Sequence, residues 1–302
     1  VSTIEHASVL EVVKHLEEMG VAVSRVGVAA DGLVDVGALT ALIQPNTFCV
    51  SIMYVNNEIG TIQPVREIAR AVRHAKKINT LGGIYPYFHC DASQALVYLP
   101  INVESFGADL ITLDSHKVYG FRGIGLLWVK RGVELSTLIY GGGQERGLRA
   151  GTENLPAAAG FAKALELCES ERAKESARTQ KLRDYFFTKL QSIFPKIIIN
   201  GSHTTRIANN INVSFPANAS GEVDHEFLLL QLDAKGVACS TKSSCLRDED
   251  ESYVIRALRQ AQNKTTTGAS GENPHALLFT LGRPTTKSDL DYTIKILQQK
   301  NK

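Results

Sequence analysis

The sequence is poor in features that mark several classes of protein. Its 302 residues contain five cysteines, two methionines and one tryptophan, and no two cysteines form a CxxC pair. Scattered cysteines do not make the disulfide framework of a secreted domain, and they favour free thiols in a reducing compartment. We therefore expect a cytoplasmic protein, or an organellar one if a targeting segment precedes Val1.

Long apolar runs and an excess of one charge are also missing. No apolar run reaches the ~18 residues that a membrane span needs, so we expect no membrane association. The 33 basic and 31 acidic residues leave a formal net charge of +2, which gives no reason to expect nucleic acid as a partner. The chain is 44% apolar and 21% charged. This is ordinary globular composition, with room for two domains.

Short apolar runs alternate with amphipathic stretches in the first half of the chain. Strands separated by helices are typical of α/β proteins with a mostly parallel sheet. The predicted helices are Ala7–Glu18, Val36–Ile43 and Val65–Lys77. The predicted strands are Val21–Val28, Phe48–Tyr54, Ile84–His89, Leu110–Leu113 and Ile124–Val129.

A long amphipathic stretch from Leu155 to about Phe194 then predicts a bridging helix into a second domain. That domain mixes predicted strands and helices: Asn210–Phe215, Val237–Cys239 and Leu277–Leu281 as strands, and Glu222–Leu232, Glu251–Gln260 and Thr286–Gln299 as helices. We expect a large domain over residues 1–160, and the bridging helix with a smaller α+β domain over residues 161–302.

Two polar sequences follow short apolar runs. Lys117 lies in Asp114-Ser115-His116-Lys117, and Asp91 ends the preceding run. We expect a lysine at a buried strand end to have few water contacts, which favours the neutral, nucleophilic form of a Schiff-base lysine. Parallel neighbouring strands would bring both ends to one sheet edge, where α/β folds bind ligands. An acid opposite such a lysine suits pyridoxal phosphate, because it keeps the pyridine nitrogen protonated.

Several motifs occur in one order and spacing: Asp91-x-x-Gln94, Ser115-His116-Lys117, Gly141-Gly142-Gly143-Gln144-Glu145-Arg146 and Arg149-x-Gly151-Thr152-Glu153-Asn154. Together they resemble class V pyridoxal-phosphate enzymes of the cysteine desulfurase group, from Val1 to the last helix. The resemblance implies a large domain of the PLP-transferase type (fold type I). Relatives carry further residues before the point that matches Val1, including a Gly/Thr segment for the cofactor phosphate. We therefore expect this sequence to be N-terminally incomplete.

The resemblance implies roles around the cofactor ring. Lys117 would hold pyridoxal phosphate, Asp91 would pair with its pyridinium nitrogen, and Gln94 would bond its ring hydroxyl or the lysine linkage. His6 would stack on the ring and shuttle protons, which suits an imidazole near neutral pH. Asn57 would lie near the same hydroxyl and the substrate carboxylate.

The cofactor phosphate would have three ligands by the same resemblance. Ser115 and His116 would donate hydrogen bonds, and Thr152 would reach the phosphate of a neighbouring subunit, which implies a homodimer. Asp114 departs from the family pattern, which has a small hydroxyl residue three positions before the lysine. A carboxylate there would repel a phosphate, so either Asp114 turns away or Ser115 substitutes.

Substrate chemistry would depend on two further residues. Arg283 would grip the amino-acid carboxylate in a bidentate fork. Cys245 would be the catalytic thiol, because it ends a small-residue loop before a helix of the family type, whereas Cys239 ends a predicted strand and is expected to be buried and inert. Lys242 replaces a small residue of the family, and its ammonium would favour the thiolate.

The resulting hypothesis is a cysteine desulfurase that uses pyridoxal phosphate and no metal. It would convert L-cysteine to L-alanine, leave a persulfide on Cys245, and pass sulfur to an iron–sulfur scaffold or a thiolation enzyme. Selenocysteine lyase is an open alternative that shares nearly every residue. Another class V aminotransferase or lyase, which would not need Cys245, and a non-enzymatic binding subunit are further alternatives.

Overall fold

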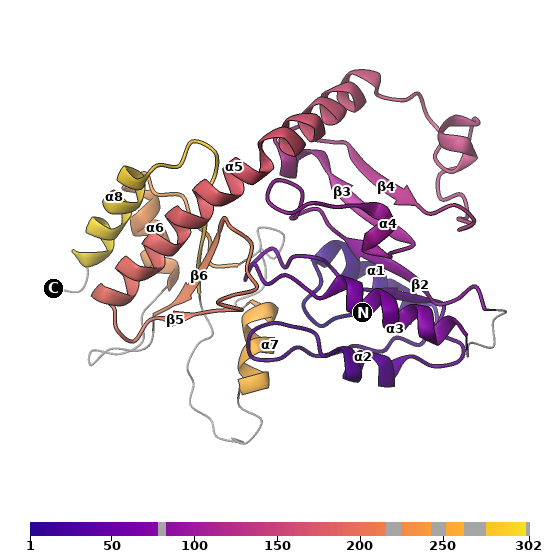
Figure 1. Cartoon of the computed structure of the whole chain (residues 1–302), viewed down its shortest axis with the longest axis horizontal. Helices are drawn as coiled ribbons and strands as arrows, with labels where there is room; N and C mark the ends of the chain where they lie inside the picture. Colours follow the sequence, from indigo (N-terminus) through magenta and orange to yellow (C-terminus); the bar gives the residue numbers. More distant parts are fainter. Residues whose placement is uncertain (78–82, 216–224, 243–251, 263–275, 300–302) are drawn as a thin grey trace.

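The computed structural model describes residues 1–77, 83–215, 225–242, 252–262 and 276–299. Figure 1 shows two sheets, each with its own helices, and one long helix that runs from the first to the second. The candidate site depends on how these parts meet.

The first sheet has the order β1-β2-β3-β4. Its strands are β1 (Cys49–Ser51), β2 (Tyr87–Asp91), β3 (Leu110–Asp114) and β4 (Gly125–Val129). The first three are parallel, and β4 runs antiparallel to β3. The prediction of an α/β protein with a mostly parallel sheet is confirmed.

Four helices accompany this sheet: α1 (Ala7–Glu18), α2 (Val36–Leu42), α3 (Val65–Lys76) and α4 (Val103–Phe106). In α3, apolar residues recur at the helical period and are buried, namely Val65, Ile68, Ala69, Val72 and Ala75. They join β1 and β2 residues such as Val50 and Phe88 in one core. This apolar stripe is why α3 covers the sheet.

Two predicted strands are wrong. Val21–Val28 makes only isolated bridges, Val26 with Ser2 and Val28 with Val34, because the partner segment turns into α1 a few residues later. Val237–Cys239 also lacks strand structure, and the pairing falls on the next residue, Ser240, which bridges Leu278.

The second sheet is antiparallel, with the order β5-β6-β7. Its strands are β5 (Ile198–Ile199), β6 (Asn210–Ser214) and β7 (Leu277–Thr280), and its helices are α6 (His225–Asp233) and α8 (Lys287–Gln298). Thr286 and Asp289 form a capping box at the start of α8. A second core joins this sheet to α8 and the end of the long helix.

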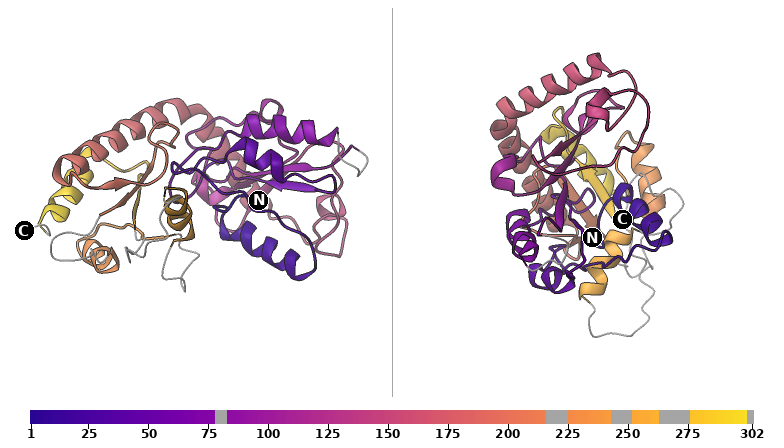
Figure 2. Two further views of the ribbon diagram at one scale, coloured as in Figure 1. Left: turned by 90° about the horizontal axis from the view of Figure 1, so that it is seen from below. Right: turned by 90° about the vertical axis from the view of Figure 1, so that its right-hand side faces the viewer.

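The long helix α5 (Leu155–Ile193) has 39 residues, a length of about 58 Å. Its first part places Phe161 in the first core, and its last part places Phe186 in the second. Figure 2 shows α5 arching from one sheet to the other. The predicted boundary between residues 160 and 161 stays a prediction, because the two cores meet along this helix.

A third cluster joins the two halves independently of α5. Helix α7 (Tyr253–Gln262) contributes Val254 and Ile255, which pack with Ile4 and Ile59 of the first half. Figure 1 shows α7 close to the first half of the chain although it belongs to the second half in sequence.

Backbone pairing locks the two halves together next to this cluster. Ile62 N–H donates to Thr205 O at 2.9 Å, and Ile207 N–H donates to Gly60 O at 2.9 Å. Gly60 has φ +68°, and a Cβ there would lie 2.5 Å from Asn210 Cβ. Only glycine fits this close approach without strain.

The part of the chain that the structure describes contains no helix that is both long and apolar enough to cross a membrane.

Replacing Gly60 by alanine tests the junction. Gly236 provides the control, because it has φ +76° and nothing within 4 Å of the added Cβ. We expect Gly236→Ala to cost about 1 kcal/mol of unfolding free energy through backbone strain. Gly60→Ala should cost about 3 kcal/mol, since overpacking is added. Urea denaturation measures both, and equal losses would show that the contact with Asn210 adds nothing.

Candidate active site

Parallel pairing of β2 and β3 brings two predicted site residues to one sheet edge. Asp91 ends β2 and lies beside Thr112 of β3, with both strands running in the same direction. The 3₁₀ turn η1 (Ser115–Val118) starts where β3 ends and carries Lys117. The expected convergence of the two strand ends is confirmed.

Lys117 is exposed, and the expectation of a lysine with few water contacts is wrong. The reason is the geometry of η1. A 3₁₀ helix has three residues per turn, so Ser115 and Val118 share the buried side. His116 and Lys117 therefore face outward. The amine is accessible from this edge.

His6 is held at the start of α1 as its N-cap. Its Nδ1 accepts the Ser8 N–H at 3.2 Å and lies 2.9 Å from Ser8 Oγ. Burial lowers the pKa of His6, while the Asp91 carboxylate raises it and the Lys117 ammonium lowers it further. The ring therefore interacts electrostatically with both groups, so His6, Asp91 and Lys117 belong to one region of the protein.

A side-chain turn presents Asn57. Its neighbour Asn56 is buried, accepts the N–H groups of Glu58 and Ile59 at 2.9 Å each, and donates to Ile4 O at 2.8 Å. Asn56 therefore has a structural role. The Oδ1 of Asn57 is buried and has no hydrogen-bond partner.

Asp114 turns toward His116. Its Oδ1 lies 2.7 Å from His116 Nδ1 and accepts the His116 N–H at 3.2 Å. The carboxylate thus caps η1 and orients the imidazole. Ser115 Oγ is buried and has no partner, and a Cβ on Gly120 would lie 2.3 Å from it. The phosphate roles of Ser115 and His116 stay predictions.

Gln94 and Thr152 differ in their surroundings. The turn after β2 is held by the Asp91 carboxylate, which accepts the Ser93 N–H at 2.9 Å, and Gln94 follows half-buried. Thr152 is exposed, and it does not cap α5, because Asn154 accepts the Ala157 N–H at 3.1 Å. Thr152 follows the second 3₁₀ turn, η2 (Gln144–Gly147). The cofactor-binding roles of Gln94 and Thr152 stay predictions.

Arg283 follows β7 and contacts the turn after Lys117. Its guanidinium carbon lies 4.8 Å from the centre of the Tyr119 ring, and its backbone N–H donates to Tyr119 Oη at 3.2 Å. Nη2 lies 3.5 Å from Glu171 of α5 and 3.9 Å from Cys168 Sγ. Nε is buried without a partner. The second half of the chain thus delivers an arginine next to the lysine turn.

Every cysteine thiol in the described ranges has a raised pKa. Burial raises the pKa of Cys49 and Cys239 to about 11, that of Cys90 well above its ordinary value, and that of Cys168 upward against the opposing effect of Arg283. These thiols remain protonated at neutral pH. Cys239 is half-buried, so the expectation that it is buried is wrong, while its raised pKa agrees with the expectation of an inert thiol. Cys245 lies outside the described residues.

Unpartnered polar atoms gather on the predicted site. Among the residues that the structure describes, five buried side-chain N or O atoms have no hydrogen-bond partner. Three of them belong to Asn57, Ser115 and Arg283, and a fourth belongs to Glu5, which precedes His6 in the sequence. Buried polar groups are nearly always satisfied in proteins. Together with an accessible lysine and the Asp91 carboxylate, these atoms fit a polar aromatic cofactor such as pyridoxal phosphate.

Sequence reasoning missed the buried carboxyl group of Glu5. Its side chain is completely buried, and Oε1 accepts Ser2 Oγ–H at 2.5 Å and Met53 N–H at 3.0 Å. The Tyr253 hydroxyl donates to its backbone carbonyl at 2.5 Å. Burial raises the pKa of Glu5 to about 7. The Glu5-His6 pair was the available signal, but it was interpreted through His6 alone.

His89 was also missed. Its Nδ1 lies 2.7 Å from Ser51 Oγ and its Nε2 lies 2.8 Å from Thr112 Oγ1, so one ring links β1, β2 and β3. It lies two residues before Asp91, and alternation along the strand puts both side chains on the same sheet face. Burial lowers the pKa of His89, which keeps the bridging ring neutral.

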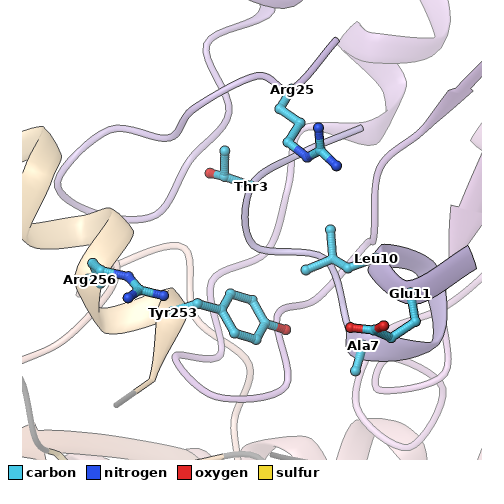
Figure 3. A pocket seen from close by; sticks show the side chains of 7 residues that line it. All are labelled: Thr3, Ala7, Leu10, Glu11, Arg25, Tyr253 and Arg256. Carbon is cyan, nitrogen blue, oxygen red and sulfur yellow. The ribbon is translucent and has the colours of Figure 1, made fainter. Parts of the chain in front are cut away.

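A cavity of about 280 Å³ borders the His6 segment (Figure 3). It is lined from α1, from α7 and from two loop positions: Thr3, Ala7, Leu10, Glu11, Arg25, Tyr253 and Arg256. The guanidinium of Arg25 is held by Glu17 at 2.5 and 2.6 Å. None of the predicted site residues lines this cavity, so it is separate from the candidate site.

Titration of Glu5 should make stability depend on pH. Because its folded-state pKa of about 7 exceeds the ordinary value of 4.5, folding takes up a proton between these values. Its contribution to stability is therefore complete below pH 4.5 and is lost as the pH rises through 7, by at most about 3 kcal/mol. We expect Glu5→Gln to lose less stability than the wild type between pH 5 and pH 8.

Urea denaturation across this pH range measures the effect. Glu104→Gln removes an exposed carboxyl group of α4 and should follow the wild-type curve. If the Glu5→Gln curve also follows it, Glu5 does not exchange a proton on folding.

Comparison with known proteins relates this arrangement to a family. The model of the family described as aminotransferase class V matches residues 1–288. The chain is 38% identical to the cysteine desulfurase IscS of Dictyoglomus turgidum over 299 residues, which cover 99% of this chain and 70% of that protein. It is 37% identical to the cysteine desulfurase IscS 1 of Archaeoglobus fulgidus, covering 98% of this chain and 72% of that protein.

Solved structures agree with this relation. A NifS-like protein superposes with a TM-score of 0.85 at 30% identity, covering 99% of this chain and 73% of that chain. A NifS-like protein from Rickettsia africae gives a TM-score of 0.81 at 25% identity, covering 99% and 74%. The expected PLP-transferase fold is confirmed. On the combined evidence of its fold, its converging site residues and these relatives, the chain belongs to the class V aminotransferase family, whose members depend on pyridoxal phosphate.

Proposed function

We propose that this chain is a pyridoxal-phosphate-dependent cysteine desulfurase, which converts L-cysteine to L-alanine. The observation that carries the proposal is that the parallel pairing of β2 and β3 brings Asp91 and the turn of Lys117 to one sheet edge. The relatives named cysteine desulfurase support the choice of reaction within the family.

The residues at the sheet edge suit the cofactor. Lys117 offers an exposed amine that would hold pyridoxal phosphate covalently, and Asp91 offers the acid for its pyridine nitrogen. When bound, the cofactor supplies an electron sink next to the substrate. Gln94 and Asn57 would hold its ring hydroxyl, and Asn57 Oδ1 has no hydrogen-bond partner among the residues that the structure describes.

The Nε2 atom of His6 is the one that can donate a hydrogen bond or exchange a proton. Because its Nδ1 accepts the Ser8 N–H, a neutral ring carries its hydrogen on Nε2. The lowered pKa keeps the ring neutral near pH 7. The hydrogen bond from the Ser8 N–H fixes the ring orientation, so Nε2 is the atom at which His6 would exchange a proton.

Arg283 and Asn57 would bind the amino-acid carboxylate. A guanidinium forms a bidentate pair with a carboxylate. The Nε of Arg283 has no partner, and its Nη2 has only long contacts in the described part of the protein. A substrate carboxylate would satisfy the arginine more fully.

The sulfur step needs a thiolate, which we assign to Cys245. The Cys245 sulfur would attack the substrate sulfur, and the substrate Cβ–S bond would break. The electron pair of that bond would stay on carbon and take up a proton, which gives the methyl group of alanine and a persulfide on Cys245. The raised pKa values of the four other thiols support this choice. Sulfur would then pass to an acceptor, such as an iron–sulfur scaffold or a thiolation enzyme.

We also propose a homodimer. The segment before α5 and the first residue of that helix expose large apolar side chains, with Leu138 89%, Tyr140 84% and Leu155 71% exposed. Such residues are unfavourable in water and mark interaction surfaces when they gather. Thr152 lies in the same segment and is exposed. A second copy covering this surface would receive Thr152 at its phosphate site.

Replacing Cys245 by alanine tests the proposed reaction. We expect Cys245→Ala to abolish alanine formation from L-cysteine, because no other thiol would accept the sulfur, while the cofactor remains bound. Cys239→Ala is the matched control and should keep activity. Alanine is quantified by chromatography, and selenocysteine is supplied in parallel. Undiminished turnover by Cys245→Ala, or wild-type turnover of selenocysteine alone, would contradict the proposal.

A charge within the apolar surface tests the dimer. We expect Leu138→Asp to shift the protein toward monomer at micromolar concentration, because burying a carboxylate opposes association. Leu230→Asp is the control, since Leu230 is exposed on α6 in the other half. Sedimentation velocity measures both variants. A wild-type protein that is monomeric would reject the homodimer.

A further inference from the structure

The guanidinium of Arg283 packs on the ring of Tyr119, the residue that ends the 3₁₀ turn η1 of Lys117. The guanidinium carbon lies 4.8 Å from the Tyr119 ring centre, and the backbone N–H of Arg283 donates to Tyr119 Oη at 3.2 Å. Tyr119 therefore contacts both the main chain and the side chain of the arginine. It lies two positions after Lys117.

The backbone of the turn directs Tyr119 to this position. Tyr119 has φ +64° and ψ +19°, a left-handed conformation that residues other than glycine rarely adopt. Its N–H donates to Ser115 O and closes η1. An unfavourable conformation of this kind persists only where the surrounding structure requires it, and such positions cluster at functional sites.

The other contacts of Arg283 are weaker. Glu171 is 3.5 Å away with half of its side chain exposed, and the sulfur of Cys168 is 3.9 Å away. Exposed ion pairs contribute little, and thiols are poor acceptors. A cation on an aromatic face is attracted by the ring without losing its N–H donors. Tyr119 thus orients the guanidinium while leaving its donors for a carboxylate.

We infer that Tyr119 is a positioning residue, which holds Arg283 for the carboxylate of the amino-acid substrate and ties that arginine to the turn of Lys117. The inference rests on the proposed function, because Arg283 is assigned there to the substrate carboxylate. It predicts an effect on carboxylate binding in particular. A general structural role of Tyr119 would affect every ligand.

Binding of L-alanine to the holoenzyme, measured by calorimetry, tests the inference without turnover. Ethylamine is the comparison ligand, because it is L-alanine without the carboxylate. We expect Tyr119→Leu to weaken L-alanine binding about tenfold and to leave ethylamine binding unchanged. Tyr119→Phe keeps the ring and loses only the hydroxyl acceptor, so it should weaken L-alanine binding about threefold.

Tyr292→Leu is the matched control. Tyr292 is 49% exposed and Tyr119 is 52% exposed, and the Tyr292 hydroxyl donates to Lys235 O at 3.0 Å, far from the lysine turn in sequence. This variant should bind L-alanine like the wild type. Thermal melting confirms that each variant is folded, and leucine at position 119 leaves a non-glycine residue in the left-handed conformation.

The outcomes separate the two proposals. Unchanged L-alanine binding by Tyr119→Leu, an equal loss for ethylamine, or no L-alanine binding by the wild type would each overturn the role of Tyr119. Turnover of L-cysteine by the wild type is assayed separately. If turnover is absent while the binding pattern is as expected, the desulfurase function fails and the role of Tyr119 stands.

Discussion

The candidate site depends on the parallel pairing of β2 and β3. This register places Asp91 and the start of η1 at the same edge of the sheet, although the acid and the lysine are 26 residues apart in the chain. An antiparallel pair would have sent the two strand ends to opposite edges. His89 reinforces the arrangement, because its ring links β2 to both neighbours. The parallel direction of β2 and β3 is therefore what brings Asp91 and the turn of Lys117 to one place.

A second constraint fastens the other half of the chain to this edge. The Tyr253 hydroxyl bonds the Glu5 carbonyl, and Ser252 Oγ–H donates to the buried Glu58 at 2.5 Å. Glu5 precedes His6, and Glu58 follows Asn57. The start of α7 is thus attached beside two predicted site residues at once. The position of the second half of the chain therefore affects the positions of His6 and Asn57.

Much of the fold could be predicted because apolar periodicity survives in the structure. The predicted bounds of Ala7–Glu18 agree with α1, and the long bridging helix differs from α5 by one residue at its end. Strand lengths were less predictable. Phe48–Tyr54 is apolar apart from Ser51, yet β1 covers only Cys49–Ser51. Beyond that strand, the N–H groups of Ile52 and Tyr54 still donate to His89 O and Asp91 O of β2. The pairing partner is not encoded in the segment itself.

The convergence of Asp91 and Lys117 at one sheet edge was predictable, but the local geometry of the candidate site was not. Motif spacing, with the family resemblance, suggested Asp91, Lys117 and Arg283 as site residues. It did not indicate that Lys117 faces water, because the three-residue period of η1 decides which side chains turn inward. It also did not indicate that Asp114 would take His116 as its partner. Neither contact could be found without knowing the backbone conformation.

Long-range contacts explain why the pairing of Tyr119 with Arg283 could not be predicted from the sequence. Tyr119 and Arg283 are 164 residues apart, and no periodicity within either segment relates them. The shared helix α5, the third core and the backbone pairing next to Gly60 together bring the end of β7 to the lysine turn. Arg283, the proposed substrate arginine, is therefore placed by the packing of the two halves, whereas Asp91 and Lys117 are placed by one sheet. A change that loosened the junction would separate Arg283 from Lys117 while leaving Asp91 and Lys117 together, so substrate binding would weaken before cofactor binding did.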